Sequence, residues 1–262
     1  MSHHGYAVPR IWEKYYSSIM IKMADATWFK RLVFNRALKI GERRADLLMD
    51  LKPVPMALKI LYFFAWLTVF RKLKERLGFE RIRVAYSGAA PISKEVLRFF
   101  QSIGMDLFEG YGQTEATGVT TSPVQGRVKF GTVGRPLNGV DVRIAPDGEI
   151  LVKSPGAFKG YYKSEKATQE SFNHGWLLTG DIGELDTDGF LRITDRKKDI
   201  IVTAGGKNIT PQYIENKLKA GIYINDAVVI GDGRKFFVLP HHDDEDNVVK
   251  FCPGQQDSVL HL

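Results

Sequence analysis

The stretch that decides the fold runs from Glu109 to Glu115 and reads Glu-Gly-Tyr-Gly-Gln-Thr-Glu. It follows an apolar run that predicts a strand, and its two glycines, Gly110 and Gly112, let the backbone approach a ligand closely. Between them Tyr111 offers a flat aromatic face. The hydroxyl and carboxylate that end the stretch suit phosphate and Mg²⁺. We interpret it as a nucleotide-binding loop, against the simpler alternative of a turn.

A second loop of small residues lies upstream, at 87–91, and reads Ser-Gly-Ala-Ala-Pro. A short strand is predicted before it over 81–87, and Ser93 is a plausible N-cap for a helix after it. Strand, loop, helix, strand and glycine loop is the order of a parallel α/β layer. Ligands bind such layers at the carboxyl ends of the strands, so we expect the two loops to face one site.

Three helical segments are predicted before this layer. Apolar side chains recur at three- and four-residue spacing over 12–23 and over 29–51, which indicates amphipathic helices. Residues 54–70 form the most apolar run and end in a basic cluster at 71–74. A helix that is buried or lines a groove is the main interpretation of this run. The alternative is contact with a membrane surface through residues 54–74.

After residue 126 the pattern changes to short strands separated by turns, which predicts a small β-subdomain. Asp181 follows a glycine at the end of an apolar strand, where it either caps a turn or binds a ribose diol. The charge run at 195–199 is either a solvated surface or a hinge. A glycine loop at 203–208 then precedes a helix with Pro211 at its first position and two strands, at 227–230 and 236–239.

The predicted fold class is therefore α/β. A partial parallel α/β layer occupies residues 1–125, the β-subdomain occupies 126–195, and the start of a small α+β domain occupies 196–262. Paired histidines occur at 3–4 and 241–242, but adjacent residues rarely converge on one metal ion. We expect a disordered terminus at the first pair and a solvated tail at the second.

Composition limits the choice of partners and compartment. The 262 residues carry a formal charge of +7, with a pI near 9.3, which suits anionic partners such as nucleotides, coenzymes and lipid headgroups. The basic residues follow no nucleic-acid-binding motif, so nucleic acid is not an expected partner. The single Cys252 and the absence of an apolar core in residues 1–10 favour a reducing cytoplasm. The oligomeric state is left open.

The ordered motifs resemble the adenylate-forming acyl-CoA synthetases, and most closely the long-chain fatty acid CoA ligases. The resemblance covers roughly residues 8–239 and rests on several ordered stretches rather than one. These are residues 8–14, 87–91, 110–115, 179–181, 195–199 and 204–208.

The resemblance implies a role for each matching residue. Tyr111 would stack on adenine, beside Gly88, Ala89 and the loop residues Glu109, Gly110 and Gly112. Thr114 would contact the ATP phosphates and Glu115 the Mg²⁺ ion, while Asp181 and Arg196 would bind the ribose hydroxyls. Asp195 would be the hinge, and Gly205 and Gly206 would line the coenzyme A channel. The implied reaction joins a fatty acid to coenzyme A through an acyl-adenylate, with ATP as the energy source.

Two elements of that family have no counterpart in this sequence. They are an upstream phosphate loop ending in Pro-Lys-Gly and a lysine segment near the C-terminus; here residues 240–246 read Pro-His-His-Asp-Asp-Glu-Asp. We therefore expect a fragment with little or no ligase activity of its own. The alternatives are a nucleotide-binding remnant without catalysis, an adenylation module of the peptide-synthetase type, and a structural or membrane-binding fragment.

Overall fold

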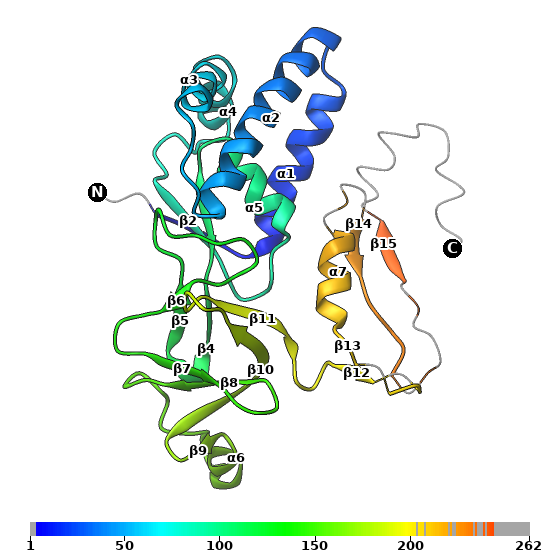
Figure 1. Ribbon diagram of the computed structural model, residues 1–262. Coiled ribbons are helices and arrows are strands. Elements are labelled where there is room, and N and C mark those ends of the chain that lie inside the picture. Colours follow the sequence, from blue (N-terminus) through cyan, green and yellow to red (C-terminus); the bar gives the residue numbers. More distant parts are fainter. Residues whose placement is uncertain are drawn as a thin grey trace.

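The computed structural model describes residues 4–202 and, beyond them, 204–206, 208–219, 221, 224–232, 234, 238 and 240–243. The N-terminal helices gather at one end of the molecule, the β-strands of the middle region lie below them, and a smaller unit built around α7 stands to one side (Figure 1). This arrangement confirms the predicted α/β fold class. The predicted domain boundaries stay predictions.

The layer that carries both loops is a three-stranded parallel sheet in the order β1-β2-β3. The strands are β1 (His4–Ala7), β2 (Val84–Ser87) and β3 (Asp106–Glu109). Helix α5 (Lys94–Ser102) connects β2 to β3, and the Ser93 hydroxyl caps it by accepting a 3.3 Å hydrogen bond from the Val96 amide, as predicted. The prediction of a disordered terminus is wrong at His4, which pairs with Val84 in β1; His3 lies outside the described residues.

Helices cover one face of this sheet. They are α1 (Pro9–Ala24), α2 (Trp28–Met49), α3 (Met56–Ala65), the π-helical turn η1 (Trp66–Phe70) and α4 (Arg71–Arg76). Large side chains from these helices, from α5 and from the sheet form one core that includes Trp12, Phe70, Phe100 and Leu107. Burying this much apolar surface is the main force that holds the layer together. In the described part of the chain, no helix has the length and apolarity needed to cross a membrane.

The prediction of a buried or groove-lining third helix is correct for only one side of α3. Leu58 and Ala65 are buried, but Met56, Phe63 and Phe64 are 72%, 56% and 57% exposed. Lys59 is the only charged residue of this helix, so the sequence gives only a weak signal of which side faces the core.

The β-subdomain contains two antiparallel sheets. One has the order β4-β5-β6 and the other β11-β10-β8-β7, with β9 paired to β10. The strands are β4 (Tyr111–Gln113), β5 (Gly118–Ser122), β6 (Arg135–Pro136), β7 (Asp141–Ile144), β8 (Glu149–Lys153), β9 (Phe172–Asn173), β10 (Trp176–Leu185) and β11 (Leu191–Arg196). The 3₁₀ turn η2 (Thr114–Ala116) follows β4, and α6 (Glu165–Glu170) precedes β9.

Strand β10 differs from the prediction. Asp181 was expected at the end of an apolar strand, but it lies inside β10, which continues to Leu185. Gly180 has a φ of +71° and the pairing with β11 shifts register between Ile182 and Gly183. A bulge of this kind bends a strand without ending it, which is why the glycine resembled a turn in the sequence.

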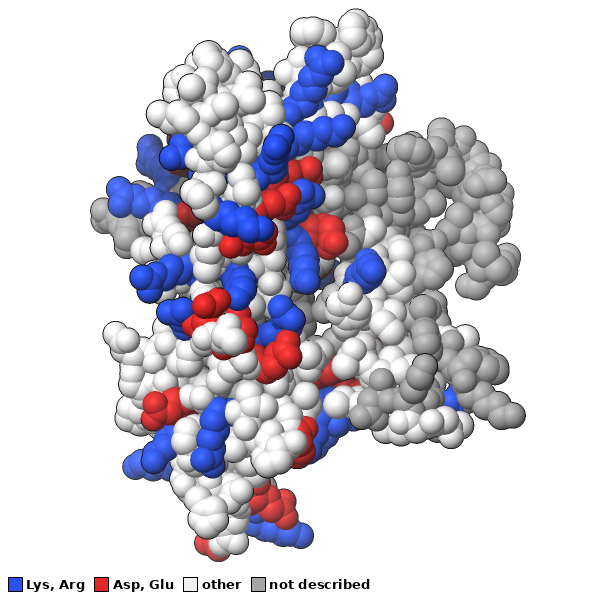
Figure 2. Space-filling view, in the orientation of Figure 1, with Lys and Arg blue, Asp and Glu red and all other residues white. Residues whose placement is uncertain are grey.

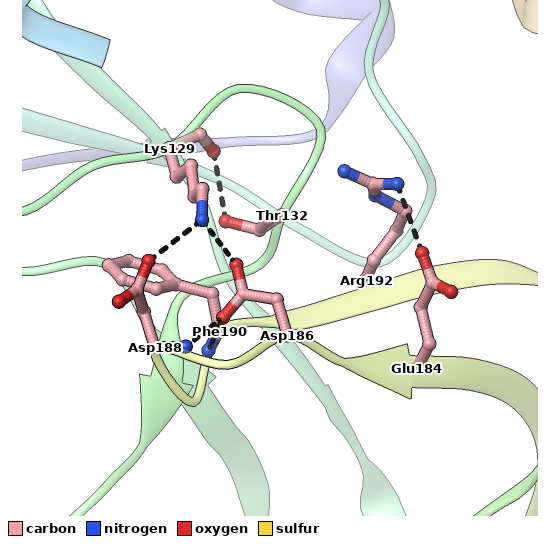
Figure 3. Close-up of polar contacts among 7 residues, drawn as sticks. All are labelled: Lys129, Thr132, Glu184, Asp186, Asp188, Phe190 and Arg192. Carbon is pink, nitrogen blue, oxygen red and sulfur yellow. Dashed lines mark hydrogen bonds and ion pairs between the residues drawn. The ribbon is translucent and has the colours of Figure 1, made fainter. Parts of the chain in front are cut away.

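A polar cluster ties the segment before β6 to the turn between β10 and β11 (Figure 3). The Lys129 ammonium contacts Asp186 at 2.6 Å and Asp188 at 3.0 Å. Asp186 also accepts hydrogen bonds from the amides of Asp188 and Phe190, which closes the turn. Charged and polar contacts therefore fix this part of the subdomain.

The C-terminal unit contains β12 (Ile201–Val202), β13 (Asn208–Ile209), α7 (Pro211–Lys219), β14 (Ile224–Ala227) and β15 (His241–Asp243). Pro211 begins α7 as predicted. The strand predicted at 227–230 instead spans Ile224–Ala227, and of the strand predicted at 236–239 the structure describes only Val238, which bridges to Ile230. Residues 241–243, predicted as part of a solvated tail, form a strand whose backbone pairs with β14.

Candidate functional site

The two predicted loops meet at the carboxyl edge of β2 and β3, as expected. Ser87 and Glu109 are register partners at the ends of the strands. The Gly110 amide donates a 3.0 Å hydrogen bond to the Ser87 carbonyl, and the Ile92 amide donates to a Glu109 carboxylate oxygen at 3.3 Å. The backbones of the two loops are therefore bonded to each other, and the Glu109 side chain also holds the residue that follows the first loop.

The small residues of the first loop are explained by crowding and by backbone conformation. A Cβ atom at Gly88 would lie 3.0 Å from the Tyr6 hydroxyl of β1 and 3.5 Å from the Gly110 carbonyl. Ala89 has a φ of +71°, in the left-handed region that a residue with a Cβ seldom adopts. Such strain is typical of functional loops.

Glu109 is an unusual carboxyl group for its position. It is half-buried at the end of β3, and burial raises its pKa to about 7, although the Ile92 amide partly opposes the shift. The neighbouring Ser87 hydroxyl is fully buried and has no hydrogen-bond partner among the described residues. Buried hydroxyl groups in proteins usually have a hydrogen-bond partner, so Ser87 is an exception at the edge of the site.

Three predicted residues from distant motifs come together in the structure. The hydroxyl of Tyr111 donates a 2.7 Å hydrogen bond to Asp181, and the Arg196 guanidinium lies 3.5 Å from the other carboxylate oxygen of Asp181. Asp181 and Arg196 are register partners in β10 and β11. Tyr111 and Asp181 are buried, whereas Arg196 is exposed.

Burial and mutual contact set the protonation of this pair. Burial, together with the adjacent Asp181 carboxylate, raises the pKa of Tyr111 and keeps the phenol protonated as a donor. Burial also raises the pKa of Asp181, while the Tyr111 hydroxyl and the charge of Arg196 oppose that shift. Asp181 is thus a buried acceptor that reaches a cation at the surface.

The glycine at 112 is required for a different reason from the one expected. A Cβ there would lie 1.8 Å from the Gly118 carbonyl of the neighbouring strand β5, which no side chain can tolerate. At Gly110 the nearest atoms would be 3.7 Å away, in ordinary contact. Gly112 therefore permits strand pairing, whereas crowding does not explain the glycine at 110.

The hydroxyl and carboxylate that follow occupy the turn η2. Thr114 is exposed, and a carboxylate oxygen of Glu115 accepts a 2.8 Å hydrogen bond from the hydroxyl of Tyr161. This bond raises the pKa of Tyr161. The Phe158 amide donates to the Glu115 carbonyl at 2.7 Å, so the segment around Tyr161 packs along the turn. Sequence reasoning gave Tyr161 no role, because its partner lies 46 residues away.

The site fits a magnesium ion held together with a phosphate ligand. Among the described residues no three His, Cys, Asp or Glu side chains gather into a metal cluster. Glu115 offers a metal ion one half-buried carboxylate, and the exposed hydroxyl of Thr114 precedes it in the chain. Mg²⁺ commonly binds one or two carboxylates and completes its shell with water and phosphate oxygens.

The predicted hinge residue is fixed from two sides. Asp195 is fully buried; one carboxylate oxygen accepts a 2.8 Å bond from its neighbour's amide, and the other has no partner among the described residues. Burial raises its pKa, while backbone bonds from Arg196 and from Gln212 of α7 oppose the shift. Two residues further along the chain, Lys197 contacts Asp147 at 2.7 Å and the buried Glu149 at 2.8 Å. Sequence reasoning did not identify this lysine clamp.

The remaining predicted residues lie apart from this cluster. Gly205 and Gly206 are exposed, and a Cβ added at either would meet no atom within 4 Å. They belong to the turn between β12 and β13, on the side of the molecule with α7 (Figure 1). The structure thus joins the residues predicted for adenine and ribose but places those predicted for coenzyme A elsewhere.

Comparison with known proteins gives these residues a context. The sequence profile of AMP-binding enzymes matches residues 3–162. The chain is 40% identical over 230 residues to the long-chain-fatty-acid–CoA ligase FadD15 of Mycobacterium bovis, covering 88% of this chain and 38% of that protein. It is 42% identical over 233 residues to the putative fatty-acid–CoA ligase fadD11 of Mycobacterium tuberculosis, covering 88% of this chain and 41% of that protein.

Solved structures show the same likeness. The O-succinylbenzoate coenzyme A synthetase of Bacillus subtilis, in complex with ATP and magnesium, superposes with a TM-score of 0.56 at 32% identity. The match covers 67% of this chain and 40% of the synthetase. The chain therefore spans about two fifths of the length of the proteins it resembles.

Proposed function

Because the chain belongs to the family of AMP-binding enzymes, we propose that it serves the ATP-dependent ligation of a long-chain fatty acid to coenzyme A. The proposed reaction passes through an acyl-adenylate, with release of pyrophosphate and then of AMP. The curated relatives at 40% and 42% identity are named as fatty-acid–CoA ligases. The chain spans about two fifths of their length. The complete reaction is therefore a proposal, and the experiments below test it on the 262-residue chain.

The observation that carries the proposal is the contact of Tyr111, Asp181 and Arg196. Three polar groups separated by up to 85 residues meet next to Gly110, where an added Cβ would lie 3.7 Å from the nearest atom. A buried carboxylate with a neighbouring cation is suited to accept hydrogen bonds from a ribose diol. In the proposal Tyr111 also stacks on adenine, and Gly88, Ala89, Glu109, Gly110 and Gly112 shape the pocket around the base.

The proposed roles at the phosphates follow from charge. Attack of a carboxylate on the α-phosphate builds negative charge on phosphorus oxygens, so positioning and electrostatic stabilisation matter more than a protein nucleophile. Bound Mg²⁺ would supply part of that stabilisation. In the proposal Glu115 holds the ion and Thr114 donates its hydroxyl to a phosphate oxygen.

The second half of the reaction is assigned to the segment after the subdomain. Asp195 is proposed as the hinge, because it is the buried residue where β11 ends and it contacts the backbone of Gln212 in α7. Gly205 and Gly206 are proposed to line the coenzyme A channel after rotation at this hinge. Peripheral contact with a membrane through residues 54–74 belongs to the same proposal, since a long-chain fatty acid partitions into lipid.

A nucleotide-binding role without catalysis is the second candidate, and one observation favours it. The Glu115 carboxylate is engaged by the Tyr161 hydroxyl, so a metal ion must displace or share that contact. The expectation that the 262 residues alone have little or no ligase activity stays a prediction.

One experiment separates these candidates. We expect Asp181→Asn to weaken ATP binding by the 262-residue chain about 10- to 100-fold, because a hydrogen bond to a charged group contributes about 1.5–3 kcal/mol. Calorimetry gives the affinity, and Asp141→Asn, on the exposed strand β7, is the matched control. Equal affinity of the two variants would contradict the site.

Turnover is measured on the same samples. Pyrophosphate released only when both ATP and palmitate are present, and lost in Glu115→Ala, would support the ligase. Binding of ATP without pyrophosphate release would support the second candidate.

A further inference from the structure

The segment at 156–161 lies along the turn η2 and is bonded to it by side chains at both of its ends. At one end the Thr117 hydroxyl donates a hydrogen bond to the Gly156 carbonyl. At the other end the Tyr161 hydroxyl donates a 2.8 Å hydrogen bond to one carboxylate oxygen of Glu115. The segment is therefore fixed against the turn, and one of its bonds reaches the side chain that is proposed above to hold Mg²⁺.

Aromatic packing holds the ring of Tyr161 in place, although 43% of the residue is exposed. The ring lies edge to face with that of Phe158, at 4.9 Å between the centroids. The Phe158 ring in turn stacks on Phe172 of β9 at 5.6 Å. Both arrangements are favourable for aromatic rings, so this packing restricts where the hydroxyl of Tyr161 can point.

The backbone of Tyr161 is anchored by the short helix α6. The Tyr161 amide donates a 2.9 Å hydrogen bond to the Thr168 hydroxyl, which itself donates to the Ser164 carbonyl at 2.9 Å. A Cβ at Gly160 would lie 2.5 Å from the Thr168 methyl carbon, so the segment passes as close to the helix as a glycine permits. No residue of α6 is buried, and Figure 2 shows blue and red side chains together at the tip of the molecule that carries it. The outer surface of α6 is thus solvated, and its inner surface holds Tyr161.

We propose that Tyr161 is a positioning residue for the metal-binding carboxylate: it holds one oxygen of Glu115 and leaves the other for Mg²⁺, while Thr168 of α6 anchors it. The inference rests on the proposed function, in which Glu115 holds the ion. In the described part of the chain, the bond from Tyr161 is the one hydrogen bond that this carboxylate accepts. Metal-binding carboxylates are usually held by hydrogen bonds from further residues, which strengthen metal binding because they orient the ligand in advance. The contact is therefore shared with the ion and not displaced by it.

The test measures how much Mg²⁺ strengthens the binding of ATP by the folded 262-residue chain. Calorimetry gives the affinity for ATP with excess Mg²⁺ and again with EDTA, and we call the ratio of the two the magnesium gain. Tyr161→Phe, which removes only the hydroxyl, should lower the magnesium gain by up to about tenfold and leave the affinity in EDTA unchanged. Thr168→Val removes the anchor but keeps Tyr161 and Glu115, and it should lower the gain about threefold.

Tyr162→Phe is the matched control, because it makes the same change at a neighbouring residue that is 88% exposed. This variant should keep the full magnesium gain, and an equal loss in it would overturn the proposal. Equal losses with Mg²⁺ and with EDTA in Tyr161→Phe would mean a merely structural role. A larger gain in Tyr161→Phe would make the tyrosine a competitor of the ion. Either result overturns the proposal, and a full gain in Thr168→Val overturns the anchoring by α6.

Glu115→Gln separates this inference from the proposed function. If Glu115→Gln loses the magnesium gain but Tyr161→Phe keeps it, only the role of Tyr161 is overturned. If Glu115→Gln keeps the gain, or if the unaltered chain shows none, the proposed role of Glu115 fails and this inference fails with it. In the double variant the gain should be no lower than in Glu115→Gln alone, because the tyrosine acts through the carboxylate.

Discussion

The α/β layer and the β-subdomain contribute loops to the same site but differ in what fills their interiors. In the layer one cluster of buried side chains spans α1, α2, α5 and the sheet, with aromatic residues such as Trp12, Phe70 and Phe100 at its centre. In the subdomain the buried cluster consists of Tyr111, Val133, Ile150, Val152 and Leu191.

Polar contacts take over where apolar burial is small. Lys129 and Lys197 each join two carboxylates in the subdomain, and the Thr121 hydroxyl donates to the Val133 carbonyl. The layer therefore acts as a scaffold for the loops at 87–91 and 109–115. The positions of Asp181 and Arg196 depend instead on individual hydrogen bonds and ion pairs.

The largest expected effect tests the scaffold. Phe100→Ala removes a fully buried ring whose centroid lies 5.4 Å from that of the Trp12 ring. We expect this change to lower the free energy of unfolding by about 3–5 kcal/mol. In a Trp176→Phe background the remaining tryptophans, at 12, 28 and 66, all lie in the layer. Urea denaturation followed by fluorescence then reports on the layer alone.

Leu191→Ala is the matching change in the subdomain. Leu191 is also fully buried, but it belongs to the smaller cluster, so we expect the fluorescence transition of the layer to stay where it is. If Leu191→Ala shifts that transition as far as Phe100→Ala does, the two interiors unfold as one and the comparison fails.

The next effect compares two carboxyl groups, the half-buried Glu109 of the layer and the buried Glu149 of the subdomain. Burial raises the pKa of Glu109 to about 7, with no cation among the partners given by the structure. The folded chain thus holds a proton that the unfolded chain releases, and the stability contributed by this group is lost as pH rises from about 4.5 to 7. Glu109→Gln should flatten that loss and be more stable at pH 8 by at most about 3 kcal/mol.

Glu149 of the subdomain should respond in the opposite way. It is buried, but it contacts Lys197 at 2.8 Å and accepts the Gly180 amide at 2.9 Å. We expect Glu149→Gln to lower the free energy of unfolding by about 1–3 kcal/mol, since it weakens bonds to a charged group. Urea titrations at several pH values measure both variants. Stabilisation by both changes would show that the polar contacts of the subdomain contribute nothing.

Much of this arrangement could be predicted from the sequence, because local patterns determine it. The parallel layer and the meeting of its two loops follow from the order of strand, small-residue loop and helix. Strand β1 was missed because its residues, His-Gly-Tyr-Ala, form no apolar run of the kind that marks β2 and β3. Strand β10 was divided because the glycine at 180 resembles a turn, although it marks a bulge.

The contacts that complete the site could not be predicted in the same way. The bond from Tyr161 to Glu115 spans 46 residues and the one from Lys197 to Glu149 spans 48. Neither pair has a local signal, because each forms only when folding brings together two segments that are distant in the sequence. The sequence left the orientation of α3 open between a buried helix and contact with a membrane, because a helix with a single charged residue has no polar side to mark its orientation.

The smallest effect tests whether one polar contact in the subdomain has a measurable value. Thr121→Val keeps the shape of a fully buried side chain but removes its 3.0 Å hydrogen bond to the Val133 carbonyl. Because that carbonyl then loses a buried partner, we expect a loss of about 1 kcal/mol in the free energy of unfolding. Thr68→Val removes a 2.7 Å bond of the same type on an exposed helix of the layer, where water replaces it, and should change little. A difference near zero between the two variants would mean that the subdomain relies on its small apolar cluster after all. A clear difference would show that buried hydrogen bonds contribute measurably to the stability of the subdomain.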